Sequence, residues 1–209
     1  MQNNNLIKTV AGFLFLMFAF SCTENKELGL PEPIIVTLEE SDHPAVGNEN
    51  APVRLVIFTD FECSYCKDFS DNVESLKKDY VGSGKVRLVI RNYPLEMHSH
   101  AFQAALCVTC AEEQGAFWEM YNTLFENQSI LSDENYLKWA TEMNLDTVQF
   151  KSCMLSEEAT NRTNSDLADG EKIGVTGTPA FIINNEMYIG APDEELLRRM
   201  LDDAIERSK

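Results

Sequence analysis

The residues of this 209-residue chain that are best suited to chemistry are Cys63 and Cys66, which frame a Cys-Ser-Tyr-Cys motif. A thiolate can attack a disulfide and form a mixed disulfide, which a second thiol three positions along can then resolve. We expect Cys63 to be the more exposed nucleophile and Cys66 the buried resolving thiol. The motif therefore predicts thiol–disulfide exchange, and the alternatives are a structural disulfide or half of a zinc site.

The motif lies where a predicted strand gives way to a predicted helix. Residues 53–59 read VRLVIFT, a β-branched run typical of a buried strand. After the motif, apolar residues recur at helical spacing at Phe69, Val73, Leu76 and Tyr80. The first turn of a helix has unpaired N–H groups and a positive dipole end, which lower the pKa of a cysteine there. Because lysine is scarce nearby, we expect this terminus to be the main cause and the decrease for Cys63 to be modest.

The elements around the motif predict an α/β fold. The other expected strands are 34–38, 86–93, 180–183 and 187–189. The last two are joined by Asn-Asn-Glu, a weaker hairpin signal than Asn-Gly. Residues 42–52 are expected to be a loop, and a last helix is expected to run to about residue 207. Between 97 and 172 only helical patterns occur, which indicates a helical insertion in which Asp133 and Asp146 are the expected N-caps.

Three segments, in the same order, resemble DsbA-like proteins of the thioredoxin superfamily. They read GNENAPVRLVIFTDFECSYCKDF, AEEQGAFWEMYNTLF and GVTGTPAFIIN. The first resembles the active-site segment, the second the helical insertion that distinguishes DsbA-like proteins from plain thioredoxins, and the third the cis-proline segment. The likeness covers roughly residues 42–207. It implies a thioredoxin-like domain at 34–209 with an inserted helical subdomain at about 97–172.

The resemblance also implies roles for single residues. Pro179 matches the cis-proline, so Thr178 and Pro179 would lie beside the dithiol and pair with an extended substrate peptide. The implied enzyme is a protein thiol:disulfide oxidoreductase without a dissociable cofactor. Its substrates would be the thiols or disulfides of exported proteins, with oxidation favoured over reduction, and a membrane redox partner would recycle it. Ser64 departs from the proline that many relatives carry, which argues against a strong oxidant.

The remaining cysteines after the motif are Cys107, Cys110 and Cys153. Cys107 and Cys110 form a second Cys-x-x-Cys, but within a helical pattern rather than at a strand-to-helix junction. About forty residues separate this second pair of cysteines from Cys63 and Cys66, which argues against a zinc site shared by all four. No metal is therefore predicted. The resemblance suggests a structural disulfide between Cys110 and Cys153. Pairing of Cys107 with Cys153 is the rival, and otherwise Cys107 is a small buried residue.

Acidic residues and histidines near the motif are candidates to assist the two cysteines. Asp60 ends the predicted strand and could lie near the buried thiol. Glu62 could assist proton transfer, although an exposed spacer is favoured. His98 and His100 are expected in a loop or at a helix cap, because residues two apart do not share a helix face.

The N-terminus indicates export. The apolar run at 10–20 is too short to cross a bilayer as a helix and is typical of a secretory signal peptide. Small residues precede Cys22, which resembles a bacterial lipoprotein signal. We therefore predict a signal peptide at 1–21 and a lipid-anchored tether at 22–33, on the periplasmic side of a bacterial cell envelope. A secreted protein with Cys22 as an ordinary thiol is the alternative.

The net charge of the chain limits the classes of partner that it can bind. It has 17 Lys and Arg residues against 34 Asp and Glu residues, a net charge of -17, and no basic block. Nucleic-acid binding depends on basic groups that neutralise phosphates, so no nucleic-acid partner is predicted. Two alternatives to the enzyme remain: a protein that binds peptides without turnover, and a metal-binding protein that uses Cys63 and Cys66.

Overall fold

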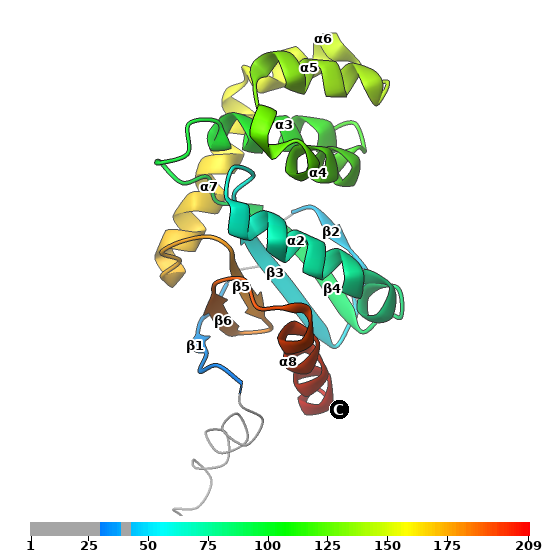
Figure 1. Cartoon of the computed structure of the whole chain (residues 1–209), viewed down its shortest axis with the longest axis vertical. Coiled ribbons are helices and arrows are strands. Elements are labelled where there is room, and N and C mark those ends of the chain that lie inside the picture. Colours follow the sequence, from blue (N-terminus) through cyan, green and yellow to red (C-terminus); the bar gives the residue numbers. More distant parts are fainter. Residues whose placement is uncertain (1–29, 39–42) are drawn as a thin grey trace, which may run out of the picture. The chain divides into compact units, whose positions relative to one another are not determined.

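The structure, a computed structural model, describes residues 30–38 and 43–209 (Figure 1). Residues 33–209 form one compact unit, to which the following description applies. The predicted signal peptide and Cys22 lie outside the described residues, as does most of the predicted tether. Within the described ranges, no helix combines the length and the apolar character needed to cross a membrane.

A mixed sheet forms the centre of this unit, with strand order β1-β6-β5-β3-β4-β2. Its strands are β1 (Ile34–Ile35), β2 (Ala45–Val46), β3 (Val53–Thr59), β4 (Val86–Asn92), β5 (Ala180–Ile183) and β6 (Glu186–Ile189). The pair β3 and β4 is parallel, so that Thr59 lies opposite Asn92, and all other pairs are antiparallel. The predicted α/β class is confirmed, and both parallel strands end at the same edge of the sheet.

The helices differ from the prediction mainly at their ends. They are α2 (Ser64–Leu76), α3 (Ala101–Glu112), α4 (Phe117–Glu126), α5 (Asp133–Glu142), α6 (Thr147–Met154), α7 (Glu157–Ile173) and α8 (Glu194–Arg207). A π-helical turn at Lys77–Val81 follows α2, and a 3₁₀ turn at Gln128–Ile130 follows α4. Asp146 caps α6 as predicted. The prediction for Asp133 was wrong, because Ser132 caps α5 and Asp133 is the first helical residue.

Three strand details also differ from the sequence prediction. Ala45–Val46 lies in the expected loop but forms a short strand that pairs with β4. Of the expected strand 34–38, only Ile34–Ile35 pairs with a neighbouring strand. The hairpin turn is Asn184-Asn185, and Glu186 already belongs to β6. Asn184 adopts a φ of 57°, which asparagine tolerates better than most residues. These short pairings depend on neighbouring strands, which a local pattern does not reveal.

Alternation along β3 places its side chains on two covered faces of the sheet. Val56 and Phe58 belong to a cluster that also contains Tyr93, and Gly170 of α7 lies against this cluster. The other face is covered by α2 and α8 (Figure 1). There, Leu55 lines a pocket together with side chains of both helices. Burial on both faces explains why the β3 sequence is a nearly continuous apolar run.

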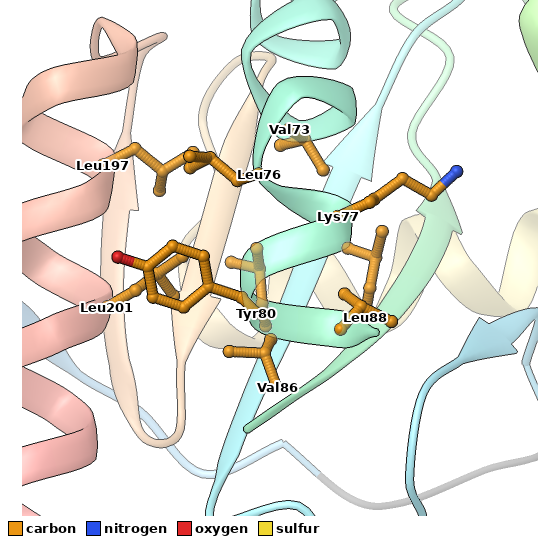
Figure 2. A pocket seen from close by; sticks show the side chains of 10 residues that line it. Val73, Leu76, Lys77, Tyr80, Val86, Leu88, Leu197 and Leu201 are labelled. Carbon is orange, nitrogen blue, oxygen red and sulfur yellow. The ribbon is translucent and has the colours of Figure 1, made fainter. Parts of the chain in front are cut away.

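The second face contains a small apolar pocket, shown in Figure 2. It lies beside the end of α2 and the π-helical turn, where Leu76 faces Leu197 of α8 and the Tyr80 ring covers one side. The Tyr80 hydroxyl donates to Asp202 Oδ1 at 2.7 Å, and burial together with this carboxylate raises the pKa of Tyr80 to about 12. A helix rise of 1.5 Å per residue places this pocket roughly 20 Å from the start of α2. It is a gap in the core away from the cysteine motif.

The inserted helices between β4 and β5 pack around α3, which is buried on nearly every side. A helix that is apolar all round is typical of the centre of a helical assembly. A disulfide joins Cys110 of α3 to Cys153 of α6, with their Cα atoms 5.7 Å apart. Cys107 is a free, fully buried cysteine on the same helix.

Candidate active site

The structure places Cys63 at the N-cap of α2, immediately after the loop that leaves β3. Its backbone is extended, with φ -81° and ψ 120°, and its carbonyl accepts from the N–H groups of Cys66 and Lys67 at 3.1 and 3.2 Å. The same carbonyl and that of Phe61 accept from Gln128 Nε2, both at 2.9 Å. The 3₁₀ turn after α4 therefore helps to hold the loop that carries the cysteine.

The two thiols of the motif differ in exposure and in partners. Cys63 is 7% exposed and its Sγ donates to the Thr178 carbonyl at 3.4 Å, whereas Cys66 is 1% exposed. The Asp60 N–H donates to Cys66 Sγ at 3.4 Å. The Thr178–Pro179 peptide is cis and follows the end of the helical insertion. The structure thus brings together Cys63, Cys66, Thr178 and Pro179 from segments more than one hundred residues apart.

These environments move the two thiol pKa values in opposite directions. A hydrogen bond from Cys66 to the Cys63 sulfur is the main cause that lowers the pKa of Cys63 to about 5 from its ordinary 9.0, against an opposing effect of burial. Burial is the main cause that raises the pKa of Cys66. The expectation of a modest decrease for Cys63, due mainly to the helix terminus, was therefore wrong. The neighbouring thiol makes the largest contribution, and the Cys66 backbone, the Thr178 side chain and the Tyr65 backbone, each through a hydrogen bond, also lower the pKa of Cys63.

Two pairs of carboxylate and imidazole flank the dithiol, and sequence reasoning did not identify either pair. Asp60 Oδ2 lies 2.8 Å from His98 Nδ1, and Glu62 Oε1 lies 3.3 Å from His100 Nδ1. Their position follows from the parallel strands, because β3 and β4 end at the same edge of the sheet and each is followed by one member of each pair. The sequence contains a signal for this cluster. Residues that follow two neighbouring parallel strands lie at the same edge of the sheet, so the acidic residues after β3 and the histidines after β4 are expected close together.

Glu62 is bound more firmly than an exposed spacer would be. Its Oε2 accepts from the His100 N–H at 2.6 Å. Burial would raise the pKa of Glu62, but the hydrogen bonds from His100 outweigh it and lower the pKa. Glu62 therefore ties the loop before the motif to the start of α3.

The other cysteines lie apart from this arrangement. Burial raises the pKa of Cys107 well above its ordinary value, so its thiol is a poor nucleophile. Cys110 and Cys153 are joined to each other. Across residues 30–38 and 43–209, no three His, Cys, Asp or Glu side chains are grouped so that they could hold a metal ion.

Comparisons with known proteins agree with this arrangement. A family model described as thioredoxin matches residues 39–203. A curated relative, the Na(+)/H(+) antiporter NhaA 3 of Salinispora tropica, is 34% identical over 174 residues, which are 81% of this chain and 26% of the antiporter. The chain spans about a quarter of the length of the first curated relatives it matches.

Two solved structures have the same fold. The thiol-disulfide exchange protein alpha-DsbA2 from Wolbachia pipientis is 24% identical, with a TM-score of 0.68 over 77% of this chain and 86% of that one. A thioredoxin-like oxidoreductase from Silicibacter pomeroyi is 27% identical, with a TM-score of 0.70 over 81% and 93%. The chain belongs to the thioredoxin family, and its fold is the DsbA-like form of the thioredoxin fold, with an inserted helical subdomain.

Proposed function

We propose that the protein is a thiol:disulfide oxidoreductase that acts on exported proteins through Cys63 and Cys66. The observation that carries this proposal is the asymmetry of the two thiols. Cys63 lies at the N-cap of α2 with a pKa lowered to about 5, and Cys66 is deeply buried with a raised pKa. At neutral pH the dithiol therefore consists of one thiolate and one thiol.

Exchange would proceed through a mixed disulfide on Cys63. In the reductive direction the Cys63 thiolate attacks a client disulfide, and the departing client sulfur leaves as a thiolate that is protonated by water. Cys66 then loses its proton and attacks Cys63 Sγ, which releases the second client thiolate. Two electrons pass to the client, and the enzyme ends as the Cys63–Cys66 disulfide. Oxidation of a client dithiol is the same sequence in reverse.

Of the two directions, we propose oxidation of client thiols. A thiolate of low pKa is a good leaving group and a stable product, so it favours the reduced enzyme and hence the transfer of client electrons to the disulfide. The pKa of about 5 for Cys63 supports this direction even though Ser64 occupies the position after the first cysteine. A membrane redox partner would then reoxidise the pair.

Client peptides would bind along Thr178 and Pro179. Cys63 Sγ lies 3.4 Å from the Thr178 carbonyl oxygen, so this stretch of backbone lies next to the reactive sulfur. An extended peptide can add its main chain to such a segment. Tyr65 is 67% exposed beside Cys63 and offers an apolar contact for an unfolded client. We assign substrate positioning to Thr178 and Pro179 on these grounds.

We also propose the cellular setting and domain arrangement indicated by the N-terminal sequence. The signal peptide would end at Ser21, and Cys22 would carry lipid and tether the domain at 34–209 to the periplasmic side of a membrane.

Turnover measurements test the enzymatic proposal. We expect oxidation of a two-cysteine peptide by the wild-type protein in a glutathione buffer, complete loss with Cys63→Ser, and no change with the matched control Cys107→Ala. Peptide binding with activity that survives Cys63→Ser would instead indicate a binding protein without turnover. Stoichiometric metal in protein purified under reducing conditions would indicate metal binding and contradict the proposal.

A further inference from the structure

Asp60 and His98 form a pair whose contacts the two-cysteine mechanism does not use. Asp60 follows β3 with a side chain that is fully buried, and His98 lies in the segment between β4 and α3 with a side chain that is 21% exposed. Burial of a carboxylate is costly unless its oxygens are fully bonded. The position of the pair beside the dithiol suggests a role in its chemistry.

The bonding of Asp60 determines which ring nitrogen of His98 donates. Asp60 Oδ1 accepts from the Glu62 N–H at 2.7 Å, and Oδ2 accepts from the Leu95 N–H at 2.8 Å. Because both oxygens act as acceptors, the 2.8 Å contact of Oδ2 with His98 Nδ1 is a donation from the ring. The Nδ1 proton is therefore held by Asp60, and the proton that titrates is the one on Nε2.

The main chain of Asp60 connects this pair to both cysteines. Its N–H donates to Cys66 Sγ at 3.4 Å, and its carbonyl accepts from the Cys63 N–H at 3.2 Å. One residue thus bonds to Cys63, to Cys66 and to the imidazole. Neither Ser64 nor Tyr65 brings a positive charge to the motif, so a protonated His98 would supply a cation from a different element.

The charged groups around His98 favour its protonated form. Burial would lower the pKa of His98, but the hydrogen bond and charge of Asp60, the charge of Cys63 and the charge of Glu62 together raise it. His100, the other histidine of this segment, is held by Glu62. The interaction of Cys63 with His98 exists only when Cys63 is a thiolate, that is, in the reduced protein.

We propose that His98, held in place by Asp60, is a positioning residue whose positive charge stabilises the Cys63 thiolate, so that reduction of the Cys63–Cys66 disulfide is accompanied by proton uptake at this imidazole. The inference deepens the proposed function and rests on it. Reduction of the Cys63–Cys66 disulfide by a client dithiol supplies two electrons and leaves a thiolate and a thiol. The client also gives up its two thiol protons. One is taken up by Cys66, and the other is shared between His98 and water.

Titration of His98 in the two redox states tests this directly. We expect NMR of the protein to show a higher pKa for the His98 ring in the reduced state than in the oxidised state. The two charges must affect each other equally, so the factor by which the thiolate favours the imidazolium equals the factor by which the imidazolium favours the thiolate. Identical titration of His98 in the two states would overturn the proposal.

Substitution of the imidazole provides the second test. His98→Asn keeps an N–H donor near Asp60 and removes the charge, and His100→Asn is the matched control in the same segment. From the pH dependence of iodoacetamide alkylation we expect His98→Asn to reduce the Cys63 thiolate-to-thiol ratio roughly threefold to tenfold at acidic pH. We expect a much smaller change with His100→Asn. A merely structural role would change stability without moving the alkylation midpoint.

The outcomes separate this inference from the proposed function. Equal midpoints in wild type and His98→Asn, with Cys63 still active in exchange, would overturn the role of His98 alone. A wild-type protein that shows no exchange activity, with Cys63 unreactive at any pH, would overturn the proposed function itself.

Discussion

At the scale of single residues, the chemistry depends on a difference between two identical side chains. Cys63 and Cys66 are three positions apart, yet Cys63 receives hydrogen bonds that favour its thiolate, while burial favours the thiol of Cys66. The more deeply buried Cys66 thiol stabilises the Cys63 thiolate by donating to it. This arrangement gives a nucleophile that is charged at neutral pH and a resolving thiol that stays protonated until a mixed disulfide forms.

The first prediction concerns the pH dependence of Cys63. Because its pKa is lowered, the thiolate is present at neutral pH and is lost as the pH falls through about 5. The rate of iodoacetamide alkylation of the reduced protein should therefore have its midpoint near pH 5, with Cys63 as the modified residue. A midpoint above pH 8, the range of an unperturbed cysteine, would contradict the thiolate assignment.

At the scale of elements, local patterns predicted what a strand or helix determines by itself. The buried strand β3, the helical spacing after the motif and the Asp146 cap all follow from neighbouring residues. β2 and the bond between Asp60 and His98 do not, because each depends on a partner more than thirty residues away. The size of the Cys63 pKa decrease was missed for a related reason, since it depends on the side-chain geometry of the folded turn.

The second prediction concerns the disulfide between α3 and α6. Cys110 and Cys153 are 43 residues apart, and closing a loop of this length stabilises the folded state by about 3–4 kcal/mol in the chain-entropy model. Cys110→Ser combined with Cys153→Ser should lower the free energy of unfolding by about this amount in denaturant titrations. Because the dithiol lies outside this loop, folded protein should keep its exchange activity. An unchanged free energy of unfolding would show that the bridge is not structural.

The third prediction concerns the contact of α7 with the sheet. A Cβ at Gly170 would lie 2.6 Å from Tyr93 Cε2 and 3.2 Å from Phe58 Cε1, within a packed aromatic cluster. Gly170→Ala should therefore lower the free energy of unfolding by about 1–3 kcal/mol through overpacking. Gly177→Ala is the control for stability, because no atom lies within 4 Å of its added Cβ. Similar losses in both variants would argue against this packing account.

At the scale of the whole molecule, the proposed attachment of the domain to a membrane depends on residues that precede it. The fourth prediction is that the full chain, produced in a bacterium that modifies lipoproteins, sediments with membranes and incorporates labelled fatty acid. Cys22→Ser should abolish the label and release the protein into the soluble fraction. Label that persists in Cys22→Ser, or a wild-type chain that is unlabelled and soluble, would contradict the lipid anchor.

The central claim is that disulfide exchange begins at Cys63. The most direct measurement is to mix Cys66→Ala protein with a disulfide-containing client peptide, quench with acid, and locate the attached peptide by mass spectrometry. We predict one peptide per chain, joined to Cys63 and released by a reducing agent. A peptide attached to Cys107, or no covalent adduct under conditions in which the peptide binds, would contradict the account.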